Sequence, residues 1–293
     1  MNYRLGVCVA AAVGVSASAD VVDVPCSRDN TLYEAPLGNL SNGACAAFFV
    51  GKTSAGTIRR GLVRFDLAGL VPAGSVVSEA QVTLTLSNTI SLEHDVLLHR
   101  SLKDWGEAGS NSGLPGGRGA PAQVGDATWL HTFYDSALWG TPGGSGVGVD
   151  PDYVEAASAV TPVGGSLEGY VWGSTAALVA DVQAWVDNPG TNFGWFVIGD
   201  ELTAGSAKRF ESRESLTAAA RPVLRVTFTR PCYPNCDGST VAPVLNVNDF
   251  ICFQQKYAAG DPYANCDGSS IPPILNVNDF ICFSTAFAGG CGQ

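Results

Sequence analysis

The feature that most constrains this chain is an internal repeat of period 30 near its C-terminus. Residues 235–260 and 265–290 align without gaps, and 17 of the 26 aligned positions are identical. The run 245–253 recurs unchanged as 275–283, and residues 231–293 contain six cysteines. So short a segment has a small hydrophobic core, and disulfides are the usual supplement. The repeat therefore predicts two copies of one loop–helix unit held together by disulfides.

The repeat also favours one pairing of these cysteines, although six cysteines allow fifteen pairings. Equivalent positions in the two copies should pair alike. This favours Cys236–Cys252 and Cys266–Cys282, and leaves Cys232–Cys291 to join the ends. A zinc site is the alternative use of clustered cysteines. The segment has no His and no C-x-x-C pair, both of which are typical of zinc sites, so disulfides are the better interpretation.

Each copy carries oxygen-bearing side chains at the spacing of a calcium-binding loop. Ca²⁺ takes oxygen ligands from alternate positions of a tight loop and from a carboxylate near the following helix. The predicted ligands are Asn235, Asp237, Ser239, Asn246 and Asp249 in the first copy and Asn265, Asp267, Ser269, Asn276 and Asp279 in the second.

These loops differ from an ordinary calcium-binding loop in length and charge. Ser239 and Asn246 are seven residues apart instead of four, and each loop offers only two carboxylates. We therefore expect weak binding, with a dissociation constant on the order of 10⁻⁴–10⁻³ M. The alternative is a disulfide-held helical hairpin that binds no metal.

With these features, residues 232–291 resemble the GC-type dockerin domains found at the C-termini of exported planctomycete-like proteins. The resemblance implies an EF-hand-like duplicated loop–helix fold, bound Ca²⁺ and a cohesin-like or other surface-anchoring partner. In dockerins, the two positions after the ninth loop residue contact the partner. Here these are Val247 and Asn248 in one copy and Val277 and Asn278 in the other. The alternative role is a sorting signal that no cohesin-like protein reads.

Residues 1–19 have the pattern of a secretory signal peptide. Arg4 is followed by an apolar run from Leu5 to Val15 and by small residues suited to cleavage after Ala19. The run is too short to span a bilayer, and no later stretch reaches 18 apolar residues, so no membrane span is expected. We predict a secreted protein. Its eight mature cysteines would all be paired, which adds Cys26–Cys45.

Residues 20–230 have the pattern of a separate all-β domain, with residues 231–293 as the second domain. Apolar and polar residues alternate over 62–67 and 82–86, which is typical of strands with one buried face. Residues 174–186 instead have helical spacing, with Ser174 as the expected N-cap. Many short strands and one helix predict a mainly β fold, a jelly-roll-like antiparallel β-sandwich.

Four segments of this region occur in the order 29–34, 59–67, 207–214 and 221–226, and together they resemble the bacterial DNRLRE domain family. Members of that family resemble carbohydrate-binding modules, and some are attached to polysaccharide-degrading enzymes. The resemblance implies a non-catalytic module that binds an extracellular polysaccharide.

Aromatic rings in or beside glycine-rich loops are the expected sugar contacts: Trp105, Trp129, Trp139, Trp172, Tyr134 and Tyr153. The net charge of -11 excludes the basic stripe of a nucleic-acid binder and slightly favours a neutral glycan. A local patch would reverse that preference if it formed from the basic residues Arg59, Arg60, Arg64, Lys208, Arg209 and Arg213.

The sequence contains no recognised catalytic motif. A glycosidase needs two nearby carboxylates, and four acidic residues are clustered in sequence: Asp200, Glu201, Glu211 and Glu214. Surface turns are the better interpretation of these four residues. We therefore predict a binding module. A polysaccharide-degrading enzyme and a structural surface protein without sugar specificity are the alternatives.

Overall fold

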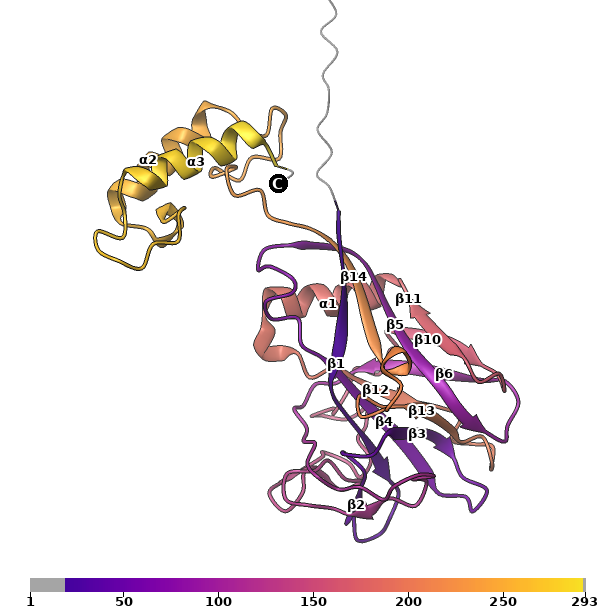
Figure 1. Cartoon of the computed structure of the whole chain (residues 1–293). Coiled ribbons are helices and arrows are strands. Elements are labelled where there is room, and N and C mark those ends of the chain that lie inside the picture. The colour runs from indigo at the N-terminus through magenta and orange to yellow at the C-terminus, as the bar shows by residue number, and fades with distance from the viewer. Residues whose placement is uncertain (1–18, 292–293) are drawn as a thin grey trace, which may run out of the picture. The chain divides into compact units, whose positions relative to one another are not determined.

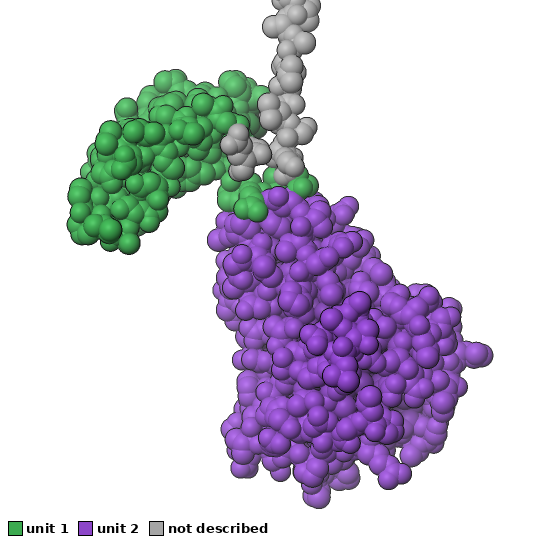
Figure 2. All heavy atoms as spheres, viewed as in Figure 1, with its two compact units in different colours: residues 1–19, 229–293 green, residues 20–228 purple. Residues whose placement is uncertain are grey.

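The computed structural model describes residues 19–291, which form two compact units (Figure 1, Figure 2). One unit is Asp20–Phe228, and the other contains the residues from Thr229 onward. The predicted signal peptide lies outside the described residues except for Ala19. No helix within residues 19–291 is long and apolar enough to cross a membrane.

The first unit is built mainly from antiparallel strands, as predicted. Six strands pair in the order β1–β14–β5–β13–β3–β4, and β4 pairs back with β1, so they close a barrel. The predicted jelly-roll sandwich is not seen. The barrel strands are β1 (Asp20–Tyr33), β3 (Ala47–Lys52), β4 (Ile58–Phe65), β5 (Val76–Thr89), β13 (Lys208–Glu211) and β14 (Val223–Thr229).

The barrel closes because its long strands change partners along their length. The first half of β1 pairs with β14, with Asp20 opposite Phe228, and the second half pairs with β4, with Arg28 opposite Arg64. The register shifts after Cys26, and such a bulge bends a strand and increases its twist. Residue alternation is the same in both halves of β1, so the pattern alone could not distinguish a sandwich from a barrel.

The remaining strands extend this wall or cap it. β12 (Trp195–Ile198), β6 (His94–Arg100) and β10 (Ala159–Val163) follow β4 in the sheet, and β11 (Gly169–Gly173) pairs with β5. Two short pairs lie in the connecting loops. They are β2 (Leu40–Ser41) with β7 (Ala120–Pro121), and β8 (His131–Phe133) with β9 (Ala137–Leu138).

The predicted helix is α1 (Ala176–Asp187), and it buries Leu178, Val182 and Trp185 in the main core. Its N-cap is Thr175, whose side chain accepts from the Leu178 N–H at 3.0 Å, and not the predicted Ser174. The Ser174 hydroxyl instead accepts a hydrogen bond from the backbone of β5. Two short 3-10 turns complete the unit, η1 (Pro189–Thr191) and η2 (Ala218–Ala220).

The second unit contains α2 (Val247–Ala259), η3 (Pro262–Ala264) and α3 (Val277–Gly289). The two α-helices occupy equivalent positions of the repeat. Phe253 and Phe283 stack at the centre of their core, with ring centroids 4.1 Å apart. The disulfides are those that the repeat favoured: Cys232–Cys291, Cys236–Cys252 and Cys266–Cys282.

The remaining predicted disulfide, Cys26–Cys45, is wrong. Both residues carry free thiols, and both are buried. The Cys26 sulfur lies 3.2 Å from the Arg28 carbonyl oxygen, and the Cys45 sulfur lies 3.7 Å from that of Gly113. An even number of cysteines predicted the pair, but a buried thiol also packs well as a small apolar side chain.

Candidate functional site

Three of the predicted sugar-binding rings belong to the core of the first unit. Trp105 and Trp172 are fully buried, and Trp139 is 5% exposed. Each indole N–H donates to a backbone carbonyl oxygen 2.7–2.9 Å away. These rings have no free face for a sugar, so they are not contacts. Glycine-rich surroundings did not distinguish a covered ring from an exposed one.

The other three candidate rings are half-buried. Trp129 lies under the Arg60 guanidinium, 5.5 Å from the ring centroid. Tyr153 packs against the ring of Phe196, and Tyr134 packs edge-on against His131. Each of these rings therefore has neighbours on part of its surface and offers at most a partial platform.

A groove lies on the outer face of the barrel, over β5, β13 and β3. Asn88, Arg209 and Phe49 are cross-strand neighbours on these three strands and line it. It consists of two adjoining hollows of about 670 and 210 Å³ that share Phe49, Asn88 and Gly117. We call this surface the basic groove and define it by Phe49, Arg59, Asn88, Arg118, Arg209 and residues 115–117.

One wall of the basic groove is a glycine-rich loop attached to the barrel. The Tyr33 hydroxyl donates to the Gly116 carbonyl oxygen at 2.9 Å, and the Arg59 guanidinium donates to that of Gly117 at 3.2 Å. Gly116 has a φ of +77°, and a Cβ there would lie 3.1 Å from the Phe49 ring. Glycine is needed at this position because the loop takes a left-handed turn directly over an aromatic side chain.

Three arginines give the groove its charge, and none of the lining residues is acidic. Arg59 lies over the Tyr33 ring, and its burial lowers the pKa of its guanidinium. Arg209 donates to the Ser87 hydroxyl at 3.0 Å. Neither these two nor Arg118 forms an ion pair with any residue of the described chain. Arg118 and Arg209 therefore present positive charge that no carboxylate of the described chain pairs with, whereas Arg59 is only 8% exposed and also interacts electrostatically with Glu34.

The sequence identified two of these arginines within its list of six basic residues. Three others of that list are neutralised: Arg60 by Glu201, Arg64 by Asp104 and Arg213 by Glu107 and Glu214. The Lys208 side chain is buried, with its ammonium donating to uncharged oxygens, and burial lowers its pKa. Arg118 was missed. Its position among glycines, at 116, 117 and 119, was the available signal for an open loop.

In the second unit, the predicted calcium loops contain buried oxygens that lack partners. The Oδ1 atoms of Asn235 and Asn265 are buried and have no hydrogen-bond partner among residues 19–291. Asp249 is fully buried at the other end of the first loop, and its Oδ1 accepts from the Asp237 N–H at 3.2 Å. The second loop repeats this contact between Asp279 and Asp267. A buried carbonyl oxygen without a donor and a buried carboxylate fit the donor set of a hard cation.

The side chains of Asn246 and Asn276 cap the two α-helices of this unit. The Asn246 Oδ1 accepts from the Asn248 N–H at 2.8 Å and caps α2, and Asn276 caps α3 in the same way. Asn is among the preferred N-cap residues, and the three-residue spacing to Asp249 forms a capping box. The three-residue spacing fits both a calcium loop and a capping box, and the structure shows the capping box.

The carboxyl of Asp279 has the charge state that a cation requires. Burial disfavours its charged form, but N–H groups of Asn276, Asp267 and Cys266 outweigh this effect, so its pKa is lowered.

The predicted partner contacts are on the surface of this unit. Val247 and Val277 are each 68% exposed, and Asn248 and Asn278 are also exposed. Ile251 and Ile281 lie one helical turn further along and are exposed too. Each helix therefore offers one apolar strip at its start, and the two strips have the same composition.

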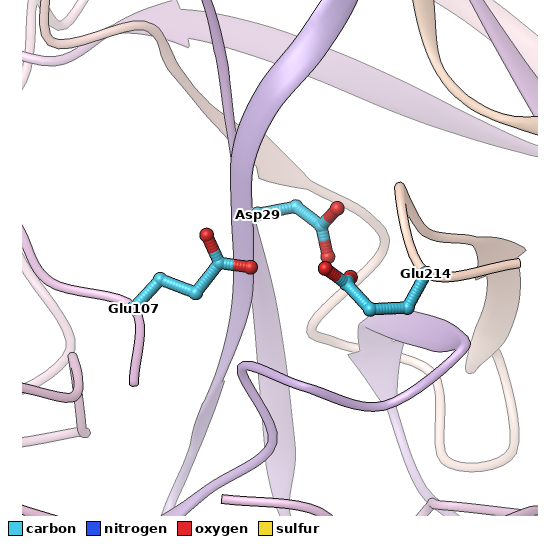
Figure 3. A group of neighbouring side chains, drawn as sticks. All are labelled: Asp29, Glu107 and Glu214. Carbon is cyan, nitrogen blue, oxygen red and sulfur yellow. The ribbon is translucent and has the colours of Figure 1, made fainter. Parts of the chain in front are cut away.

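The carboxylates considered for catalysis do not form one site. Asp200 pairs with His94, and Glu201 pairs with Arg60. Glu214 instead joins Asp29 and Glu107, and one oxygen from each lies within 4.8 Å of the others (Figure 3). We call these three residues the carboxylate cluster. None of them lines the basic groove.

The environment of the carboxylate cluster favours protonated carboxyls. Burial raises the pKa of Asp29 well above its usual range and raises that of Glu107 to about 7. Burial also raises the pKa of Glu214. The Arg213 Nε lies 2.9 Å from both Glu107 and Glu214, and it is the cation that the cluster contacts.

Comparison with known proteins adds no family to these observations: no family model matches the chain, and no curated protein matches it. The resemblances to DNRLRE domains and to GC-type dockerins therefore stay predictions from the sequence.

Proposed function

We propose that residues 20–228 are a non-catalytic module that binds an extracellular polysaccharide carrying acidic groups, in the basic groove. The observation that supports this most is the presence of Arg118 and Arg209 in one open groove without a carboxylate partner, beside the largely buried Arg59. A guanidinium binds carboxylate and sulfate groups with two parallel hydrogen bonds. A groove that crosses three strands also suits an extended chain of repeating units.

The overall negative charge does not oppose this proposal. The chain carries a net charge of -11, but charges further away than a Debye length of about 10 Å at 0.1 M salt are largely screened. Local arginines therefore dominate the potential inside the groove. The burial of Trp105, Trp139 and Trp172 also removes half of the rings that were expected to contact a sugar.

Affinity electrophoresis of residues 20–293 in gels containing a carboxylated, a sulfated or a neutral polysaccharide tests the proposal. We expect retardation by one or both acidic polymers, and we expect Arg118→Gln and Arg209→Gln to weaken it. Arg225→Gln is the matched control, because the Arg225 guanidinium on β14 pairs with Asp23 on β1 at 2.7 Å, away from the groove. Equal retardation in the neutral gel, or retention unchanged by both groove variants, would exclude the groove. Release of reducing or unsaturated ends would indicate the enzyme instead.

We also propose that the second unit binds Ca²⁺ in its two loops. The buried Oδ1 atoms of Asn235 and Asn265 support this, because a buried carbonyl oxygen without a donor is costly unless a cation or water satisfies it. Titration calorimetry of the oxidised chain should show weak Ca²⁺ binding, which Asp237→Ala with Asp267→Ala abolishes. Asn235→Asp with Asn265→Asp should tighten it, since affinity rises with the number of charged ligands. Absence of any heat with both the parent and the Asp variant would contradict this proposal.

For the same unit we propose anchoring to a cohesin-like or other surface partner through Val247, Asn248, Val277 and Asn278. Their exposure in two equivalent apolar strips supports it. Cells expressing the full chain should retain it at their surface, and cells expressing a chain without residues 231–293 should release it. Val247→Lys with Val277→Lys should mimic the deletion. If only the deletion releases the protein, the tail is a sorting signal and not a docking surface.

A further inference from the structure

The carboxylate cluster joins three segments that are distant in sequence. Asp29 lies on β1, Glu107 lies in the irregular segment after β6, and Glu214 follows β13 (Figure 3). Arg213 ties them together. Its Nε lies 2.9 Å from Glu107 and from Glu214, and its backbone N–H donates to the Asp29 carboxyl at 2.8 Å.

The charges of this cluster do not balance when every carboxyl is ionised. Three carboxylates would face one guanidinium, and Asp29 is 1% exposed while the Glu107 side chain is 6% exposed. The other groups that face them add one further cation and two acidic groups. They are Cys26, whose sulfur lies 3.9 Å from Asp29, Asp126, which binds the Ala108 N–H, and Arg221 beside Glu214. At least one carboxyl therefore keeps its proton in the compact arrangement.

The segment that carries Glu107 continues directly into the wall of the basic groove. Residues 106–111 run from the cluster to Ser112, whose N–H donates to the Asn42 side chain at 2.9 Å, and residues 115–117 then line the groove. Asp29 is fixed within a barrel strand, whereas Glu107 lies outside any strand or helix. The Gly106 N–H donates to the Thr132 carbonyl oxygen and the Ala108 N–H donates to the Asp126 carboxylate, so a loss of the proton would first move the Glu107 side chain between these two anchors.

We propose that the carboxylate cluster is a proton-dependent latch. A proton kept within the cluster of Asp29, Glu107 and Glu214 relieves the repulsion between its carboxylates and so favours the packing of segment 106–119 against the barrel, and release of that proton to solvent as the pH rises loosens the segment. The pKa of Glu107, raised by burial to about 7, places the change near neutral pH. Its consequence for ligand binding, a less ordered groove wall at higher pH, rests on the proposed function. The latch itself does not.

Two measurements on residues 20–293 test the latch without a ligand. Carbon NMR of the side-chain carboxyls should show a Glu that titrates with a midpoint near 7 and disappears in Glu107→Gln. Hydrogen exchange of amides 106–119 should accelerate several-fold between about pH 5 and about pH 8, beyond the intrinsic change of exchange rate. Glu107→Gln should remove this excess, and the exposed Glu168→Gln should keep it.

The proposal is overturned if no carboxyl titrates above about pH 6 in the unsubstituted chain, whether or not Glu107→Gln folds. It is also overturned if exchange of residues 106–119 follows the intrinsic rate. Gel retardation as a function of pH separates the two proposals. If the acidic polysaccharides do not retard the protein at any pH, the groove function is wrong. The hydrogen-exchange result then still tests the latch by itself.

Discussion

The Tyr233 hydroxyl donates a hydrogen bond to the Tyr263 carbonyl oxygen at 2.9 Å, and the Tyr263 hydroxyl donates one back to the Tyr233 carbonyl oxygen. The two residues occupy equivalent positions of the repeat, and their rings stack with centroids 4.9 Å apart. The two copies of the second unit are thus joined by a reciprocal contact.

This reciprocity predicts equal effects of the two hydroxyl deletions. Tyr233→Phe and Tyr263→Phe should each lower the free energy of unfolding of the second unit by about 1 kcal/mol, since each removes one hydrogen bond and keeps the ring. Tyr257→Phe is the control, because no described residue hydrogen-bonds to its hydroxyl. Thermal unfolding of the oxidised chain measures the effect. If the two variants lose very different amounts of unfolding free energy, the two contacts are not equivalent.

A second prediction concerns the ion pair between Arg60 and Glu201. The guanidinium makes two hydrogen bonds to the carboxylate, at 2.7 and 2.9 Å, and two more to the carbonyl oxygens of Gly143 and Gly144. Arg60→Gln should destabilise the first unit by about 3 kcal/mol, because it leaves a largely buried carboxylate unpaired. Arg225→Gln breaks an exposed pair and should cost much less than Arg60→Gln. Urea unfolding of both variants would show whether burial makes this difference.

The third prediction is that the first unit is less stable at neutral pH than in mild acid. Asp29, Glu107 and Glu214 have raised pKa values, so the folded state binds protons that the unfolded chain has already released. The free energy of unfolding should therefore fall as the pH rises from about 4.5, the ordinary pKa of a Glu side chain, to about 7. Glu107→Gln should flatten this part of the profile. Stability that rises over the same interval would contradict the assigned shifts.

Asp200 should act in the opposite direction at lower pH. A hydrogen bond to the Thr203 side chain and N–H groups of Thr203 and Leu202 lower its pKa to about 2, so its contribution is lost as the pH falls from about 4 toward 2. Together, the two effects predict maximal stability of the first unit in mild acid.

The fourth prediction compares two glycines with similar backbone angles. Gly194 has a φ of +71°, and a Cβ there would lie 2.0 Å from the Val63 carbonyl oxygen, whereas Gly56 has a φ of +84° and open space around it. Gly56→Ala should cost about 1 kcal/mol for the left-handed backbone alone. Gly194→Ala should cost about 3 kcal/mol or more, because β4 must also move. Similar unfolding midpoints for the two variants would contradict this prediction. They would show that the left-handed backbone angle sets the cost, and not the close approach of the added Cβ to Val63.

The fifth prediction concerns the free thiols of Cys26 and Cys45. Both are buried, and burial also raises the pKa of Cys26, so neither should react with a thiol reagent in the folded chain. In denaturant without reductant, residues 20–293 should react with two equivalents of the thiol reagent. The folded protein should react with none. A chain that shows no thiol even when unfolded would contain the Cys26–Cys45 disulfide after all.

The parts of the structure that local pattern determines could be predicted from the sequence. The duplicated helices, the three disulfides of the second unit and the helix over 176–187 each depend on residues close together in the chain or related by the repeat. Alternation over 62–67 and 82–86 likewise predicted strands, since it reports one buried face and one exposed face.

The basic groove and the carboxylate cluster could not be predicted in this way. Asn88, Arg209 and Phe49 become neighbours only through the order β5–β13–β3, and no local pattern encodes that order. Asp29, Glu107 and Glu214 meet for the same reason. Ring exposure was also beyond the sequence, because Trp105 and Trp129 share glycine-rich surroundings but only the first is fully buried.

The pairing of β14 has a mechanical consequence for a chain that is held at its tail. β14 lies between β1 and β5, and its last residue, Thr229, leads into the second unit. A pull on that end, resisted by a polymer in the groove, runs along the strand and loads two hydrogen-bonded ladders at once in shear. Rupture would then require many bonds to break together.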